Sequence, residues 1–132
     1  MKQKVIDVVF DGGMKINANM DDMLILTDQP VKEGGEGSGP TPFQLFLASL
    51  ATCAGIYAKR FCDTRKIATD GLALQVVCDF AEKGFKVEKM TFELTLPEGF
   101  PTKYESAIVR AIDLCTVKKH IKEAPDFEIV TK

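Results

Sequence analysis

Two cysteines are the residues in this chain best suited to chemistry. Cys53 and Cys115 lie 62 positions apart, and each falls on the apolar side of a segment whose pattern predicts a helix. A thiolate is a nucleophile, and two thiols that folding brings together can cycle between a dithiol and a disulfide. The separation excludes a local Cys-x-x-Cys motif, so any pairing depends on tertiary structure. The two residues are therefore candidates for a redox site.

The remaining cysteines and the histidine favour no other chemistry. Cys62 follows Cys53 by nine residues, which places it roughly 180° around the same helix, and Cys62 and Cys78 fit the common role of a small buried apolar residue. The sole histidine, His120, is five residues from Cys115 and points about 140° away from it on one helix, too far to act as its base. Gaps of 9, 16 and 37 residues between successive cysteines do not fit zinc-ligand spacing, so we expect no metal.

Composition places the chain among ordinary soluble proteins. The 132 residues are 45% hydrophobic and 27% charged, which predicts one domain over residues 1–132. A net charge of -2 provides no basic field for nucleic acid. The apolar stretch near the N-terminus is too short and too interrupted by acidic residues for a signal peptide. In a reducing compartment, four cysteines are expected to be free, catalytic or redox-sensing rather than structural cross-links. We therefore expect a cytoplasmic protein with no nucleic-acid or membrane partner.

The elements that must position the cysteines follow from periodicity and turn residues. The pattern predicts three strands, a flexible glycine- and proline-rich loop, a long helix, a hairpin, a second helix opened by a capping box, and a last strand. The corresponding ranges are 5–10, 14–20 and 23–27 for the strands, 31–42 for the loop, 43 onward for the helix, 72–80 and 90–96 for the hairpin, Thr102 and Glu105 for the capping box of the helix to about 121, and 127–130 for the last strand. The predicted class is α+β, in the order βββ-α-ββ-α-β.

The first helix is apolar on every side. Residues 43–58 carry no charge, which indicates a helix buried all round. A membrane span would need ~20 predominantly apolar residues, and this run is shorter, contains polar residues and is followed at once by Lys59 and Arg60, so we reject that alternative. Because a domain this small has difficulty covering such a helix, the sequence predicts an extensive homodimer.

Two motifs resemble a known family. Residues 39–53, Gly-Pro-Thr-Pro-Phe-Gln-Leu-Phe-Leu-Ala-Ser-Leu-Ala-Thr-Cys, resemble the central-helix signature of the OsmC/Ohr family of osmotically inducible and organic-hydroperoxide-resistance proteins. Residues 115–119, Cys-Thr-Val-Lys-Lys, resemble its second cysteine motif, and the order of elements agrees over nearly the whole chain. The resemblance implies a sheet packed on a long central helix in an intertwined homodimer. It also implies that Cys53 is the peroxidatic thiol and Cys115 the resolving one.

The same resemblance implies a reaction without a bound cofactor. Cys53 would be oxidised by a hydroperoxide to a sulfenic acid, Cys115 would form a disulfide with it, and an external dithiol or lipoyl group would reduce that bond. No metal, flavin or haem is required.

Activation of the thiol departs from the family pattern. Organic-hydroperoxide peroxidases of the family place an arginine shortly after a Gly-Gly turn and a glutamate after the proline that opens the helix, where this chain has Met14, followed by Lys15, and Phe43. Since a thiol needs a cation, a helix N-terminus or a base to ionise at neutral pH, Lys15 and Arg60 are the activating candidates.

Two functions follow from this reading. The first is a thiol-dependent peroxidase of organic or inorganic hydroperoxides in oxidative-stress defence, with a substrate pocket formed by Phe46, Ser49, Leu50 and Tyr57. The second is a non-catalytic protein that keeps the fold and either binds a small ligand or senses redox state.

Overall fold

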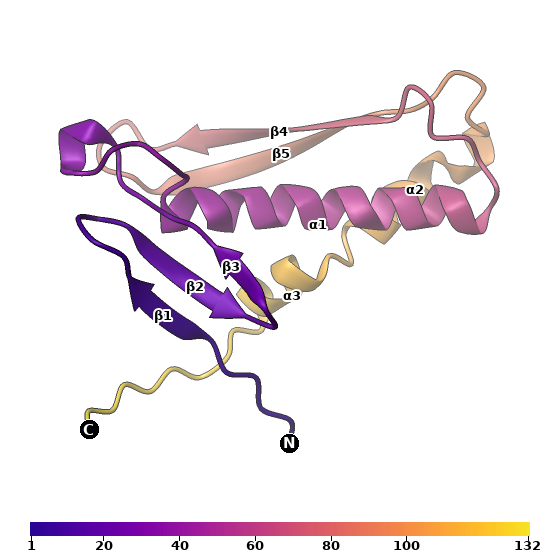
Figure 1. Cartoon of the computed structure of the whole chain (residues 1–132). Helices are drawn as coiled ribbons and strands as arrows, with labels where there is room; N and C mark the ends of the chain where they lie inside the picture. Colours follow the sequence, from indigo (N-terminus) through magenta and orange to yellow (C-terminus); the bar gives the residue numbers. More distant parts are fainter. The chain divides into compact units, whose positions relative to one another are not determined.

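The computed structural model describes residues 1–132, which form two compact units, residues 1–48 and 49–132. The class is α+β, as predicted. The elements, labelled in Figure 1, are β1 (Asp7–Phe10), β2 (Ile16–Met20), β3 (Met23–Ile25), the 3-10 turn η1 (Val31–Glu33), α1 (Pro42–Thr64), β4 (Ala73–Phe80), β5 (Val87–Thr95), the 3-10 turn η2 (Thr102–Tyr104), α2 (Glu105–Ile112) and α3 (Thr116–Lys122).

The first unit contains the predicted three-stranded meander. Its antiparallel sheet has the order β1-β2-β3, with Phe10 opposite Ile16 and Met20 opposite Met23. Asp21 and Asp22 make the tight turn between β2 and β3 with φ values of 49° and 63°. Aspartate tolerates this left-handed region better than most residues because its short side chain can hydrogen-bond locally.

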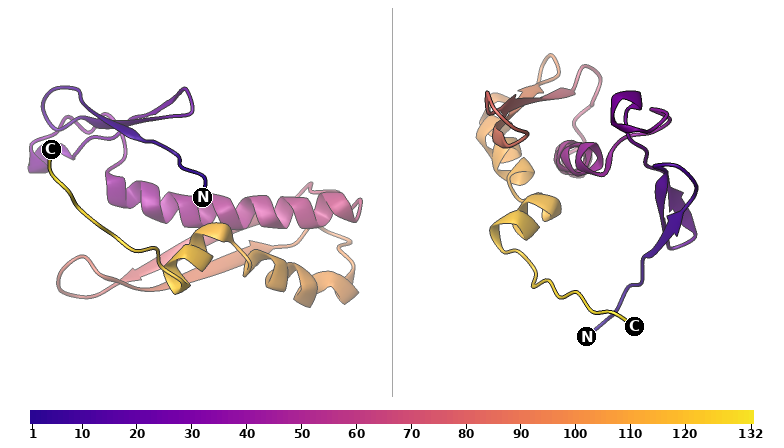
Figure 2. Two further views of the ribbon diagram at one scale, coloured as in Figure 1. Left: turned by 90° about the horizontal axis from the view of Figure 1, so that it is seen from below. Right: turned by 90° about the vertical axis from the view of Figure 1, so that its left-hand side faces the viewer.

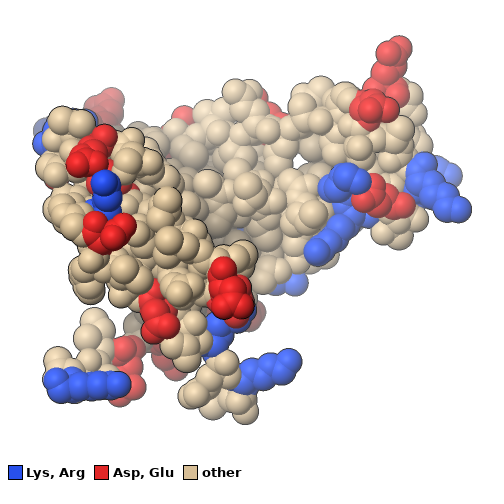
Figure 3. Space-filling model, viewed as in Figure 1, with Lys and Arg blue, Asp and Glu red and all other residues tan.

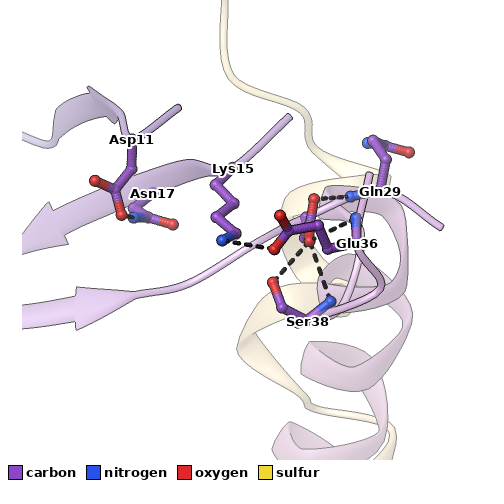
Figure 4. Close-up of polar contacts among 7 residues, drawn as sticks. Asp11, Lys15, Asn17, Gln29, Glu36 and Ser38 are labelled. Carbon is purple, nitrogen blue, oxygen red and sulfur yellow. Dashed lines mark hydrogen bonds and ion pairs between the residues drawn. The ribbon is translucent and has the colours of Figure 1, made fainter. Parts of the chain in front are cut away.

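A buried carboxylate organises the loop that follows the sheet. Asp28 is 1% exposed, and its carboxylate accepts hydrogen bonds from the Ser38 hydroxyl (2.7 Å) and from the backbone N–H groups of Ser38 (3.1 Å), Gln29 (2.8 Å) and Glu36 (3.1 Å). Figure 4 shows the donor residues Gln29, Glu36 and Ser38 gathered around these contacts. The Ser38 hydroxyl and backbone bonds hold the pKa of Asp28 well below its usual range.

This loop is therefore held in place, in contrast to the flexible loop that its glycines and prolines predict. A Cβ atom at Gly35 would lie 1.9 Å from the Gln29 carbonyl oxygen, so the close turn around Asp28 requires glycine at that position.

The second unit contains the predicted hairpin. Strands β4 and β5 are antiparallel with Leu74 opposite Leu94, and the register shifts between Asp79 and Phe80. Figure 2 shows the hairpin running alongside α1. The core of this unit joins Ala58, Phe61 and Cys62 of α1 to Ile108 of α2, with partly buried apolar residues of the hairpin packed around them. Cys62 is fully buried, in line with its expected structural role.

A capping box opens α1. The Thr41 hydroxyl accepts a hydrogen bond from the Gln44 N–H (3.1 Å), and the Gln44 side-chain oxygen accepts one from the Thr41 N–H (2.9 Å). Pro42 occupies the first helical position, where its missing N–H costs nothing. The helix therefore begins where the sequence Thr-Pro-Phe-Gln indicates.

The predicted burial of α1 on every side, with a second copy of the chain as its covering, stays a prediction. Within the single chain only one face is buried, formed by Leu50, Ala54, Ala58, Phe61 and Cys62. Ile56 remains 43% exposed on the other side of the helix. By length and composition alone α1 could cross a membrane, a test that core helices of soluble proteins also pass. Burial on all sides would need a covering that one chain does not supply.

The C-terminal third corrects three predictions. The helix expected from Thr102 to about Ile121 is split into α2 and α3, and Thr102 makes no side-chain cap because a 3-10 turn precedes α2. The split occurs because Cys115 adopts an extended backbone, with φ -46° and ψ 127°. Residues 127–130 form no strand, since no strand of the same chain pairs with them.

Candidate active site at two thiols

The fold brings Cys53 and Cys115 together within the second unit. Cys53 lies partly buried in α1, and Cys115 is 2% exposed at the residue that precedes α3. Both are free thiols, and their side chains are hydrogen-bonded to each other. The tertiary structure therefore brings the two thiols together, a pairing that their separation in the sequence left open.

The backbone N–H groups at the start of α3 lie beside both sulfur atoms. The backbone N–H groups of Thr116 and Val117 donate to the Cys53 sulfur, and those of Val117 and Lys118 donate to the Cys115 sulfur. The first N–H groups of a helix have no partner within it, so they are available to an acceptor placed at its start. The extended backbone of Cys115 creates this start beside Cys53.

These contacts shift the pKa values of the two thiols in opposite directions. Burial raises the pKa of Cys53, but the hydrogen bond from the Cys115 side chain, the N–H groups of Val117 and Thr116 and the charge of Arg60 together lower it below its ordinary value. Burial raises the pKa of Cys115, and donating to Cys53 raises it further. Cys53 is thus the thiol that ionises first, with Cys115 donating to its thiolate.

Two side-chain contacts fix α3 in this position. The Tyr57 hydroxyl, one turn after Cys53 on α1, lies 2.7 Å from the Thr116 hydroxyl. Asp113 and Lys118 form an ion pair across the break between α2 and α3. Tyr57, which the sequence assigns to a substrate pocket, therefore contacts the start of α3. His120 Nδ1 lies 2.7 Å from the Thr116 carbonyl oxygen of its own helix.

An apolar pocket of about 240 Å³ reaches Cys115. Leu50, a predicted pocket residue, lines it, whereas Phe46, Ser49 and Tyr57 do not. Its apolar lining comes from α1, the hairpin and α2, and its charged residues belong to α2, α3 and the break between them. The full lining is Leu50, Ala54, Leu74, Phe92, Leu94, Val109, Arg110, Ile112, Asp113, Cys115 and Lys118. The pocket can hold an alkyl or aryl group next to the second thiol.

The other predicted residues are distributed between the units. Lys15 belongs to the first unit, where its Nζ atom lies 2.8 Å from Glu36 Oε2 (Figure 4). Phe46 stacks on Phe43 with ring centroids 5.9 Å apart. The Ser49 carbonyl accepts a hydrogen bond from the Thr52 hydroxyl. Of the two activating candidates, Arg60 acts on Cys53 in this structure through its charge.

Sequence reasoning missed the helix start at Cys115. The continuous apolar stripe through Tyr104, Ile108 and Ala111 favoured one helix through residue 115. The available signal was weak: Thr116 and Val117 are β-branched and lower the helix propensity just after the cysteine. No group of three or more metal-ligating side chains is assembled anywhere in the structure.

Comparison with known proteins identifies a family and related folds. A protein-family model described as OsmC-like protein matches residues 35–130. A search of curated proteins finds no match. Among solved structures, an osmotic stress induced and detoxification response protein from Psychrobacter arcticus is 21% identical with a TM-score of 0.73, covering 90% of this chain and 88% of that one.

Two further structures share the fold. An organic hydroperoxide resistance protein OsmC from Legionella pneumophila is 21% identical with a TM-score of 0.58, covering 92% of this chain and 90% of its own. An OsmC-like protein from Mycoplasma pneumoniae is 19% identical with a TM-score of 0.63, covering 93% and 89%. Because the family model spans most of the chain and includes both cysteines, this protein belongs to the OsmC-like family.

Proposed function

We propose that this protein is a two-cysteine peroxidase that reduces organic or inorganic hydroperoxides in oxidative-stress defence. The observation that carries the proposal is the Cys53 thiol, whose pKa is lowered by the Cys115 side chain and by the start of α3. A general redox role agrees with membership of the OsmC-like family and with the hydroperoxide-resistance relative from Legionella pneumophila. The peroxidase activity is the more specific claim.

The oxidative half of the cycle uses both thiols. The Cys53 thiolate attacks the outer oxygen of the hydroperoxide, the O–O bond breaks, and the leaving alkoxide takes a proton from solvent to become an alcohol, or water when the substrate is hydrogen peroxide. Cys53 is then a sulfenic acid. Cys115 displaces its hydroxyl group as water and forms the Cys53–Cys115 disulfide, so two electrons have passed from the protein to the substrate.

The reductive half requires an external donor of two electrons. A small dithiol or a lipoyl group exchanges with the disulfide through a mixed disulfide, which restores both protein thiols and leaves the donor oxidised. No protein-bound cofactor takes part in either half. The apolar pocket beside Cys115 favours an organic hydroperoxide over hydrogen peroxide, because an alkyl or aryl group gains free energy by leaving water.

The test is consumption of cumene hydroperoxide and hydrogen peroxide by the purified protein with dithiothreitol. We expect turnover in the parent protein, no turnover in Cys53→Ser and a stalled sulfenic acid in Cys115→Ser. Cys78→Ser, which changes a part-buried thiol of β4, is the matched control and should keep full activity. Equal activity in Cys53→Ser and Cys78→Ser would refute the proposed roles.

A redox-sensing or ligand-binding role is the second candidate. It is favoured by Met14 and Phe43 at the places where family peroxidases carry arginine and glutamate. This role predicts that Cys53 and Cys115 form a disulfide slowly with hydroperoxide and that dithiothreitol does not sustain turnover. Quantitative rates in the same assay distinguish the two roles. For either role we propose a cytoplasmic homodimer.

A further inference from the structure

All three arginines of the chain line one groove. Arg60, Arg65 and Arg110 lie around a groove of about 390 Å³ in the second unit, between α1 and α2. No acidic residue lines it, and the rest of its lining is Tyr57, Phe61, Thr64, Ala107, Ala111 and Leu114. Figure 3, in the view of Figure 1, shows basic side chains gathered around fewer acidic ones near the C-terminal end of α1.

None of these arginines is neutralised by a carboxylate. The four ion pairs of the structure all use lysines, namely Lys4, Lys15, Lys59 and Lys118. Lysine accounts for 14 of the chain's 17 basic residues, and lysines form all of these ion pairs. The three arginines, by contrast, all lie at the groove, so the groove is distinguished by the type of its basic residues as well as by their charge. Guanidinium groups differ from ammonium groups in presenting a planar fork that matches the two oxygens of a carboxylate or phosphate.

The Arg65 side chain is packed against aromatic rings at the groove. The Arg65 guanidinium lies 3.6 Å from the centre of the Phe61 ring and 5.4 Å from that of Tyr104, and Nη1 donates to the Phe61 carbonyl (3.3 Å). This packing holds the Arg65 side chain in one position, and an arginine has five N–H donors, so most remain available to a ligand. Phe61, Ala111 and Leu114 supply apolar surface beside the charges.

We propose that this groove is a binding site for a small organic oxyanion, a carboxylate or phosphate held by Arg60, Arg65 and Arg110, and that Arg60 and Tyr57 couple its occupancy to the reactivity of Cys53. Arg60 supplies a positive charge that favours the Cys53 thiolate. Tyr57 lines the groove and contacts Thr116, whose N–H donates to Cys53. An anion in the groove offsets the Arg60 charge and therefore makes the Cys53 thiolate less stable.

Binding is tested directly, by NMR titration of the protein with inorganic phosphate in one arm and benzoate in the other. We expect saturable shifts in the groove residues, and the tighter probe identifies whether phosphate or an aromatic carboxylate is the better ligand. Arg60→Gln and Arg110→Gln should each weaken binding about tenfold, because each removes a charge-assisted hydrogen bond. Lys89→Gln on β5, which lies outside the groove lining and removes the same charge, should leave affinity unchanged.

A variant that keeps the positive charge distinguishes hydrogen bonding by the guanidinium group from simple charge attraction. Arg60→Lys keeps the charge but loses the fork, so its affinity should fall below that of the parent protein. No saturable binding of either probe, or equal weakening by Arg60→Gln and Lys89→Gln, overturns the site. Thermal unfolding of each variant confirms that the fold is intact.

Coupling is tested by the rate at which iodoacetamide alkylates Cys53, followed by mass spectrometry. We expect the bound oxyanion to slow alkylation in the parent protein and to have no effect in Arg60→Gln, whose rate is already low. Binding without any change in the Cys53 rate would overturn the coupling. Both readouts are independent of peroxidase turnover, so failure of the proposed enzyme activity leaves this test interpretable.

Discussion

At the candidate site, the Cys53 and Cys115 side chains are joined by a hydrogen bond between their sulfur atoms. Cys115 donates to Cys53, which lowers the pKa of Cys53 and raises that of Cys115. In the proposed peroxidase cycle, this order of ionisation makes Cys53 the attacking thiol, although burial opposes its ionisation. In the same proposal, Cys115 both activates Cys53 before oxidation and forms the disulfide with it afterwards.

The dual role of Cys115 is testable by pH-dependent alkylation of Cys53. Iodoacetamide reacts with the thiolate, so the rate rises as pH passes the Cys53 pKa from below. In Cys115→Ala the donor is lost, and we expect the midpoint to move upward by about one pH unit. In Cys115→Ser a hydroxyl donor remains, and the midpoint should stay closer to that of the parent protein. Identical profiles in the two variants would contradict this role.

At the scale of elements, the site depends on how α3 is attached to α1. The N–H groups that face the sulfurs belong to the first turn of α3, and the Tyr57 hydroxyl on α1 contacts the Thr116 hydroxyl of that turn. A short helix is only marginally stable alone, so its position depends on such tertiary contacts.

Removal of the Tyr57 hydroxyl should therefore affect Cys53. Tyr57→Phe loses one hydrogen bond, worth about 1 kcal/mol of folding stability. We also expect a higher Cys53 pKa and slower alkylation at neutral pH, because α3 is held less firmly. Tyr104→Phe, whose ring packs edge-on against Phe61, is the control and should leave the alkylation rate unchanged. Equal alkylation rates in both variants would remove Tyr57 from this role.

The start of α1 offers a second test at this scale. Thr41→Ala breaks the capping box with Gln44 and should destabilise the protein by about 1 kcal/mol, measured as a lower midpoint in urea unfolding. Thr102→Ala is a matched control: the sequence predicts a cap there, yet Thr102 makes no cap hydrogen bond. We expect its midpoint to remain near that of the parent protein, and a loss as large as that of Thr41→Ala would contradict the assignment.

Considered as a whole molecule, the single chain leaves large apolar side chains exposed near its C-terminus. Phe127, Ile129 and Val130 are 87%, 96% and 71% exposed, and they lie in the segment whose sequence predicts a strand. Large apolar side chains left in water are costly, and a second copy of the chain can cover them.

We expect light scattering at micromolar concentration to give twice the 14.5 kDa mass of the chain. The same covering would pair residues 127–130 with a strand, which predicts slow amide exchange in that segment. In Phe127→Asp, a charge in the interface should raise the monomer fraction, whereas Lys132→Glu at the chain end should not. A monomer mass for the parent protein would contradict this prediction.

The sequence by itself determined the class, the three-stranded meander, the long α1 helix, the hairpin and the two cysteines of interest. These follow from local rules, since periodicity and turn residues act over neighbouring positions. Only the tertiary structure decided the break at Cys115, the missing cap at Thr102, the contact of Tyr57 with Thr116 and the gathering of three arginines around one groove. The Tyr57–Thr116 contact and the arginine groove join residues distant in the chain, whose geometry no local pattern encodes. The break at Cys115 has only the weak local signal of two β-branched residues, which the longer apolar stripe outweighs in the sequence.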